Sequence, residues 1–348
     1  VYSESRGGLE AMDELLKKLS EINGVSGNEN DVRNTVKSEA AKYADEVTVD
    51  NVGNVIAYKK GKKSTARIML CAHMDEVGLM VSYVEDNGFI KFKSVGGVDQ
   101  RVLLSKRVKI GKNGITGVIG VKAIHLQPQA ERGNVIPLQS MYIDVGASSK
   151  DGTGVKVGDY ISFCTKFDDF GDGKIKGKAL DDRLGVAALL EILKNTYDDD
   201  IYACFTVQEE IGLRGAGPAA YVIKPDIAIV CEATTAADVP GVKEADCVTA
   251  LGMGPAVSYA DAATIGDKKL VREIIDTAST NNIRYQIKRA AYGGNDAGTI
   301  HISGDGIPTA VISVPCRYIH SPVCVADYSD YENMKALLDA YLRNRNNI

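Results

Sequence analysis

The stretch IMLCAHMDE, residues 68–76, carries the pattern from which the fold of the chain can be worked out. Its first four residues are apolar, as in a strand that is buried on both faces of a sheet. The stretch continues to two side chains of metal-binding type, His73 and Asp75. Ligands of open α/β sheets bind beyond the carboxyl ends of the strands. The stretch therefore predicts a central strand of an α/β sheet with a functional group at its end.

Three more apolar segments end in the same way. The segment at 201–207 leads to Glu209 and Glu210, the segment at 227–231 leads to Glu232, and the segment at 309–314 leads to His320. Apolar residues at helical spacing predict helices at 183–194, 268–280 and 328–343. The alternation of strands and helices predicts an α/β fold with a mixed sheet that is covered by helices on both faces.

The segment 77–174 differs from the rest of the chain. Short stretches of alternating apolar and polar residues are separated by turn sequences, such as Asp-Asn-Gly at 86–88 and Asn-Gly at 113–114. Regular turns at this spacing, without helical periodicity, predict a small all-β barrel or sandwich. We therefore expect a discontinuous α/β domain made from 1–76 and 175–348, with a β-barrel domain inserted between these parts.

Two helices are expected near the N-terminus. Apolar residues at helical spacing predict a first helix over 9–22, followed by an Asn-Gly pair that ends it. Ser26 and Glu29 have the spacing of a capping box, in which two side chains bond the free amides of a helix start. The sequence thus predicts a second helix that begins at Ser26. Strands are expected afterwards at 46–50 and 54–59.

The composition of the 348-residue chain excludes several classes of partner. With 41 Lys and Arg against 46 Asp and Glu, the formal net charge is −5, which gives no reason to expect nucleic acid or an anionic membrane. No apolar run approaches the roughly 20 residues needed to span a bilayer. Neither a GxGxxG nor a Walker pattern supports a nucleotide cofactor. Seven cysteines without a CxxC pair fit a reducing compartment, so we expect a cytoplasmic protein.

The side chains at the predicted strand ends have the chemistry of a two-metal site. The acidic pair Asp181-Asp182, at the start of a predicted helix, adds carboxylates to the histidines and glutamates. Mixed imidazole and carboxylate ligands suit zinc, cobalt or manganese, and two such ions can turn water into a nucleophile. In the His-x-Asp at 73–75 the aspartate can orient the imidazole. In the Glu-Glu pair at 209–210 one residue can bind metal while the other transfers a proton.

Five segments resemble motifs of the tetrahedral aminopeptidase family, whose members are dimetal peptidases also known as glutamyl aminopeptidases and, in older usage, endoglucanases. The segments are CAHMDEVG (71–78), KALDDRLG (178–185), TVQEEIGLRGA (206–216), GGNDAGTIH (293–301) and RYIHSP (317–322). The resemblance extends from about residue 12 to the C-terminal helix. It implies an aminopeptidase that hydrolyses N-terminal residues from peptides through a bridging water, activated by two divalent ions, zinc or cobalt.

The resemblance also implies a role for each site residue. Two sets of ligands with Asp181 in common would hold the ions: His73, Asp181 and Glu232 for one, and Asp181, Glu210 and His320 for the other. Glu209 would be the general base and acid, and Asp75 would orient His73. A cis peptide bond is expected between Asp181 and Asp182. The inserted β domain of the family mediates dimerisation and assembly into a hollow tetrahedral dodecamer.

Two residues depart from the family pattern, because Glu232 stands where aspartate is usual and Asn295 where threonine is common. Another dimetal amidohydrolase, a deacylase or a carboxypeptidase, would use the same ligands and stays an alternative. A glucanase is less favoured, because the chain has no Trp and because two histidines have no role in a two-carboxylate glycosidase mechanism. A non-catalytic scaffold is also less favoured, since Glu209 and all ligand positions hold competent residue types.

Overall fold

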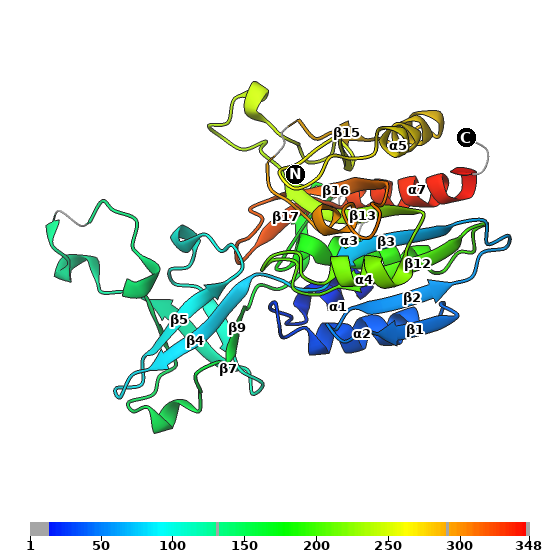
Figure 1. The fold of residues 1–348 in the computed structure, drawn as a ribbon. Helices are drawn as coiled ribbons and strands as arrows, with labels where there is room; N and C mark the ends of the chain where they lie inside the picture. Colours follow the sequence, from blue (N-terminus) through cyan, green and yellow to red (C-terminus); the bar gives the residue numbers. More distant parts are fainter. Residues whose placement is uncertain (1–13, 130–131, 290–291, 346–348) are drawn as a thin grey trace.

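The computed structural model describes residues 14–129, 132–289 and 292–345, which form an α/β body with a β-barrel lobe beside it (Figure 1). The α-helices are α1 (Glu14–Glu21), α2 (Asn30–Ala40), α3 (Leu180–Ile192), α4 (Ala216–Ile223), α5 (Lys268–Thr280), α6 (Ala297–Ile300) and α7 (Tyr328–Asn344). Among the residues described, none of these helices has both the length and the apolar character needed to cross a membrane.

Eleven strands make up the large sheet of the described chain. They are β1 (Glu46–Val49), β2 (Val55–Lys59), β3 (Arg67–His73), β10 (Asp168–Gly171), β11 (Lys174–Gly177), β12 (Asp200–Thr206), β13 (Ile227–Thr235), β14 (Ala256–Ser258), β15 (Gln286–Ile287), β16 (Thr309–Arg317) and β17 (Cys324–Asp327). The order across the sheet is β1-β2-β12-β3-β13-β16-β17-β11-β10, with β14 and β15 beside β16. The four central strands β12, β3, β13 and β16 are parallel, and their outer neighbours pair antiparallel. The predicted mixed sheet is confirmed.

Strand β3 shows why helices are needed on both faces of the sheet. Ile68 and Leu70 join an apolar cluster that contains residues of α1, α2, α3, α5 and α7. Met69 and Cys71 join a second cluster that contains residues of α4 and α6. Successive side chains of a strand point to opposite faces of the sheet. A strand that is apolar throughout therefore needs helices packed against both faces. The predicted helices on both faces are thus confirmed.

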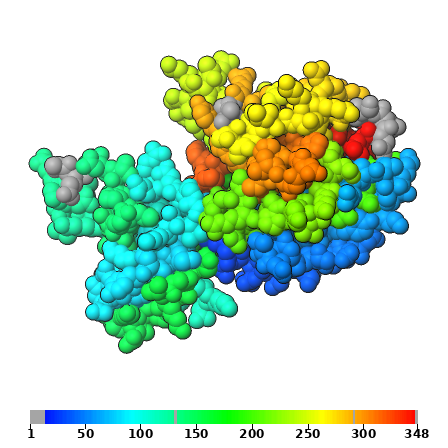
Figure 2. Space-filling model, in the orientation of Figure 1, coloured from blue at the N-terminus to red at the C-terminus, as the bar shows by residue number. Residues whose placement is uncertain are grey.

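The second lobe is a closed barrel of six strands within the described residues. The strands are β4 (Gly78–Val84), β5 (Ile90–Val95), β6 (Arg107–Ile110), β7 (Ile115–Gly120), β8 (Tyr142–Asp144) and β9 (Tyr160–Phe163). Neighbouring strands are antiparallel, in the order β4-β5-β8-β7-β6-β9, and an apolar core of its own fills the barrel. Figure 2 shows the lobe projecting from one side of the body. The expected β barrel is confirmed, while β10 and β11 pair within the large sheet.

The N-terminal prediction needs one correction. Helix α1 covers the later part of the range 9–22, and the earlier part lies outside the described residues. The capping box is wrong, because α2 starts at Asn30 and Glu29 makes no side-chain cap. The Ser26 hydroxyl instead donates to Asp75 Oδ2 at 2.6 Å, and Glu29 Oε1 accepts from the Gly27 amide at 2.7 Å. The Ser26 contact is tertiary, and Glu29 also makes a tertiary contact, since its Oε1 accepts the Gln208 amide at 3.2 Å.

Candidate metal centre

The central strands bring the predicted site residues to one edge of the sheet. His73 is the last residue of β3, and in the register of the parallel pair it lies opposite Thr206, the last residue of β12. Glu209 and Glu210 follow shortly after β12. Because the strands are parallel, their carboxyl ends open on the same side, where ligands of α/β sheets bind.

Two further strands and one helix complete the site. Glu232 lies inside β13, which continues four residues beyond its predicted end at 231. His320 follows β16 by three residues. Asp181 lies in the first turn of α3, and its peptide bond to Asp182 is cis, as expected. The structure therefore gathers all seven predicted site residues, from elements that are far apart in the chain.

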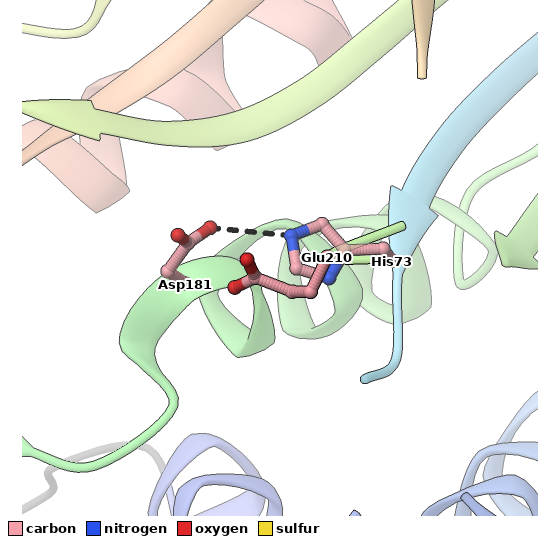
Figure 3. A group of neighbouring side chains, drawn as sticks. All are labelled: His73, Asp181 and Glu210. Atoms are coloured by element: carbon pink, nitrogen blue, oxygen red, sulfur yellow. Dashed lines mark hydrogen bonds and ion pairs between the residues drawn. The ribbon is translucent and has the colours of Figure 1, made fainter. Parts of the chain in front are cut away.

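Through their Nε2 atoms, the two imidazoles lie within 3.4 Å of three carboxylates. His73 Nε2 lies 3.2 Å from Asp181 Oδ1 and 3.3 Å from Glu232 Oε1. On the other side, His320 Nε2 lies 3.4 Å from Asp181 Oδ2 and 3.3 Å from Glu210 Oε2. Figure 3 shows Asp181 and Glu210 approaching His73 from the start of α3 and from the turn after β12. Asp181 thus presents one oxygen to each imidazole.

These distances fit a divalent ion. In a tetrahedral site with bonds of about 2.0–2.1 Å, two donor atoms lie about 3.3 Å apart. His73, Asp181 and Glu210 offer one group of donor atoms within 4.8 Å of one another, and His73, Asp182 and Glu232 offer a second. In the second group, however, both Asp182 oxygens already accept backbone amides. The amides are those of Gly185 at 2.9 Å and His73 at 3.3 Å.

The charges of the site also call for a cation. Burial raises the pKa of Glu209 to about 11, that of Glu210 to about 8 and that of Glu232 to about 7. Burial alone would lower the pKa of His73, but the Glu232 and Glu209 carboxylates hold it well above its usual range. The bond to Asp181 raises the pKa of His320 to about 9. Two imidazoles cannot neutralise this many buried carboxylates, so the centre attracts protons or metal ions.

Asp75 connects His73 to the Glu209-Glu210 turn. On the side of the ring that faces away from Asp181, His73 Nδ1 lies 3.2 Å from the main-chain carbonyl oxygen of Asp75 and 3.4 Å from its Oδ1. The same oxygen accepts the Glu209 amide at 3.0 Å, and Oδ2 accepts the Glu210 amide at 3.2 Å. A carboxylate behind an imidazole orients the ring and selects its tautomer. Asp75 therefore lies behind His73 as expected, but its main-chain carbonyl is nearer to Nδ1 than its carboxylate is, and sequence reasoning missed both this contact and the two amide contacts.

The loops around the centre have an unusual backbone. Residues with left-handed φ lie next to or within the site: Ala179 (φ 53°), Gln208 (φ 58°), Tyr318 (φ 61°) and His320 (φ 57°). Such conformations cost of order 1–3 kcal/mol each in non-glycine residues, and they persist only where surrounding contacts enforce them. The loops at the ends of β12 and β16, and the one before α3, are thus held in place by tertiary contacts.

A cavity of about 280 Å³ opens directly onto the centre. His73, Asp181 and Glu209 line this cavity, and Lys288 and Asn295 are also among its lining residues. Asn295 is buried and bonded on both sides, since Nδ2 donates to Asp261 Oδ2 at 3.0 Å and Oδ1 accepts the Ala297 amide at 3.0 Å. It shapes the wall of the cavity. Lys288 was not identified from the sequence, because no local pattern marks a lone lysine as part of a pocket.

Comparison with known proteins agrees with this geometry. A model of the M42 glutamyl aminopeptidase family matches residues 53–337. The chain is similar to the lysyl aminopeptidase of Pyrococcus furiosus, with 35% identity over 94% of this chain and 96% of that protein. It is also similar to the structure of a TET aminopeptidase from a marine sediment Thaumarchaeota archaeon, with 37% identity, a TM-score of 0.92 and 95% of both chains covered.

A third similar protein is the TET1 peptidase of Pyrococcus horikoshii, which is described as able to assemble into a tetrahedron or a large octahedral shell. It shares 34% identity with this chain, at a TM-score of 0.84, over 95% of this chain and 98% of that one. The matches favour an aminopeptidase over the deacylase, carboxypeptidase and glucanase alternatives. On the extent of the family match and of these similarities, the chain belongs to the M42 glutamyl aminopeptidase family.

Proposed function

We propose that this protein is a metal-dependent aminopeptidase that removes N-terminal residues from peptides with a pair of divalent ions. The observation that carries the proposal is the position of Asp181 between two imidazoles, with Oδ1 3.2 Å from His73 and Oδ2 3.4 Å from His320. A carboxylate in this position can bridge two ions. Membership of the M42 family also supports the proposal of a metal-dependent aminopeptidase.

The contacts support one assignment of ligands to the two ions. His73, Asp181 and Glu232 would hold the first, and Asp181, Glu210 and His320 the second. Imidazole with carboxylate suits zinc or cobalt, which we propose as the metals. When bound, a pair of such ions supplies Lewis acidity to the scissile carbonyl and to water. A glutamate at position 232 retains a ligand oxygen, which contacts His73 Nε2 at 3.3 Å.

We propose that Glu209 transfers the proton. It lines the cavity, is buried, and lies farther from His73 Nε2 than Asp181 and Glu232 do, with its Oε2 at 3.9 Å against 3.2 and 3.3 Å. Burial raises the pKa of Glu209, and bound divalent ions beside it would lower that pKa again, so that its carboxylate could accept a proton from the attacking water while the water oxygen bonds to the carbonyl carbon. The same proton would pass to the leaving nitrogen as the C–N bond breaks. Asp75 would keep His73 oriented throughout.

The barrel suggests how the chain assembles. We propose that the inserted domain, 77–174, mediates self-association of this chain, from dimers up to a tetrahedral dodecamer. The similar Pyrococcus horikoshii protein, described as forming a tetrahedron or an octahedral shell, supports this proposal. A cytoplasmic location is also proposed, and it is supported by seven cysteines that are all free. Peptides would be the substrates.

Hydrolysis of aminoacyl-p-nitroanilides by metal-stripped enzyme, before and after reloading with zinc or cobalt, tests the proposal. N-acetylated substrates and a soluble glucan are the controls. We expect cleavage that requires both the metal and a free α-amine. Cleavage of blocked substrates alone would instead identify a deacylase or an endopeptidase. Hydrolysis of the glucan would overturn the assignment to peptides.

A further inference from the structure

Three consecutive backbone amides in the turn after β12 are held by two buried carboxylates. The Gln208 amide donates to Glu29 Oε1 at 3.2 Å. The next two amides, of Glu209 and Glu210, donate to the two oxygens of Asp75 at 3.0 and 3.2 Å. Buried amides need partners, and these three have left the sheet, where strand pairing would supply them. The two carboxylates therefore decide how this turn is oriented.

The loop between α1 and α2 holds both carboxylates in turn. The Ser26 hydroxyl donates to Asp75 Oδ2 at 2.6 Å, and the Gly27 amide donates to Glu29 Oε1 at 2.7 Å. Ser26, Glu29 and Asp75 are 1%, 2% and 0% exposed. Because these side chains are buried and bonded to defined atoms, they have little freedom to choose other partners.

This loop is itself anchored beside the end of β3. Val25 pairs with Glu76 in a parallel bridge, and the Ser26 amide donates to the Glu76 carbonyl at 3.2 Å. The Gly24 amide donates to Glu76 Oε1 at 2.8 Å, and the same carboxylate accepts Lys178 Nζ at 2.7 Å. A continuous set of contacts thus runs from the α1–α2 loop to the two glutamates of the centre.

We propose that Ser26 and Glu29 are positioning residues, which aim the side chains of Glu209 and Glu210 by holding the backbone of the turn from which they project. Ser26 acts through Asp75, and Glu29 acts through the Gln208 amide. Gln208 adopts a left-handed φ of 58°, so the turn depends on such outside contacts. The inference rests on the proposed roles of Glu209 in proton transfer and of Glu210 in metal binding.

Three variants test the inference: Ser26→Ala, Glu29→Ala and Glu29→Gln. For Ser26→Ala and Glu29→Ala we expect kcat to fall at least about tenfold with KM little changed, since a displacement near 1 Å can cost up to about a hundredfold in rate. Both variants should also bind cobalt or zinc more weakly in titrations of the metal-stripped protein. Glu29→Gln keeps an acceptor oxygen for the Gln208 amide, and it should restore most of kcat and of the metal affinity.

Two matched controls lie elsewhere in the body. Asp330 is a buried carboxylate that accepts the Gly252 and Gly254 amides at 2.8 and 2.7 Å, so Asp330→Ala removes contacts of the same kind away from the cavity. Thr309→Val likewise removes one buried hydroxyl, which donates to the Ile307 carbonyl at 2.8 Å. Both controls should lower the midpoint of unfolding but leave kcat and metal affinity near those of the parent protein.

Measurements of folding, kcat and metal affinity distinguish a failure of this inference from a failure of the proposed function. Circular dichroism and thermal unfolding establish whether each variant is folded at the assay temperature. If Glu29→Ala does not fold, the comparison of Ser26→Ala with the controls tests the inference. The inference is overturned if the folded variants keep the kcat and the metal affinity of the controls. If the parent protein itself hydrolyses no peptide, the proposed function fails, while the metal titrations still test whether Ser26 and Glu29 position Glu210.

Discussion

Glu209 shares the cavity with the proposed ligands but is not among them, and this difference can be measured. Glu209→Gln keeps the shape of the side chain and removes its ability to take a proton. We expect the metal content to be retained and kcat to fall by roughly 10²–10⁴-fold, the usual contribution of a positioned acid or base. Metal analysis beside steady-state kinetics checks this. Glu210→Gln should instead lose metal, and unchanged turnover in Glu209→Gln would remove Glu209 from the mechanism.

Lys288 lines the cavity beside the centre, where its side chain could contact the first residue of a peptide. Its Nζ donates to the Tyr292 carbonyl at 3.3 Å, and burial lowers the pKa of its ammonium group, while the Asp261 and Glu232 carboxylates act in the opposite direction. A cation in a half-buried wall attracts an acidic side chain. We expect Lys288→Met to lower kcat/KM for glutamyl-p-nitroanilide about tenfold relative to the leucyl substrate, which corresponds to about 1.4 kcal/mol. An unchanged ratio would exclude Lys288 from selectivity.

The protonation of the centre predicts how metal binding depends on pH. The pKa values of Glu232, Glu210 and His320 are raised to about 7, 8 and 9, so below these values the groups hold protons that a metal ion must displace. Lowering the pH from 8 to 6 should therefore weaken metal binding, by about tenfold per pH unit for each proton displaced. Calorimetric titration of the metal-stripped protein in weakly coordinating buffers checks this. Equal affinities at pH 6 and pH 8 would contradict it.

At the scale of elements, α3 joins the site to the core. It carries Asp181 in its first turn, and almost every one of its side chains is buried between the sheet and neighbouring helices. Leu189 is fully buried within it. We expect Leu189→Ala to cost about 2–5 kcal/mol in the free energy of unfolding, because it leaves a cavity in the core. Val222→Ala on the exposed side of α4 should change stability by about 0.5 kcal/mol or less. Denaturant unfolding compares the two variants.

The sequence predicted those strands and helices that have a strong apolar pattern, but it misplaced the end of a strand that contains a polar residue. The strands at 201–207 and 309–314 and the helix at 268–280 appear as β12, β16 and α5, because burial and periodicity act over the whole element. Strand β13 extends past residue 231 because residues 232–235 still pair with β16, and Glu232 is accommodated there beside His73, although a glutamate by itself indicates the end of a buried strand. Local polarity therefore gave the wrong boundary where the tertiary structure buries a charge.

At the scale of the whole molecule, the barrel lobe predicts self-association. The lobe stands apart from the body in Figure 2, and η2 (Ile124–Leu126) exposes two large apolar side chains, with 63% of Ile124 and 60% of Leu126 accessible to solvent. Exposed apolar residues in a projecting lobe are typical of interaction surfaces. Multi-angle light scattering should give a multiple of the 37.2 kDa chain mass. A mass close to that of one chain would contradict the proposed assembly.

The sequence by itself predicted the α/β body, an all-β segment within it and the seven side chains that the structure brings together at the centre. Periodicity and side-chain chemistry are local properties, and strand ends converge by a general rule of parallel sheets. Only the tertiary structure decided what Ser26 and Glu29 do. Ser26 bonds a residue 49 positions away, and Glu29 bonds one 179 positions away. Locally the pair resembles a helix cap, but its partners are within reach only after the chain has closed around β3 and β12.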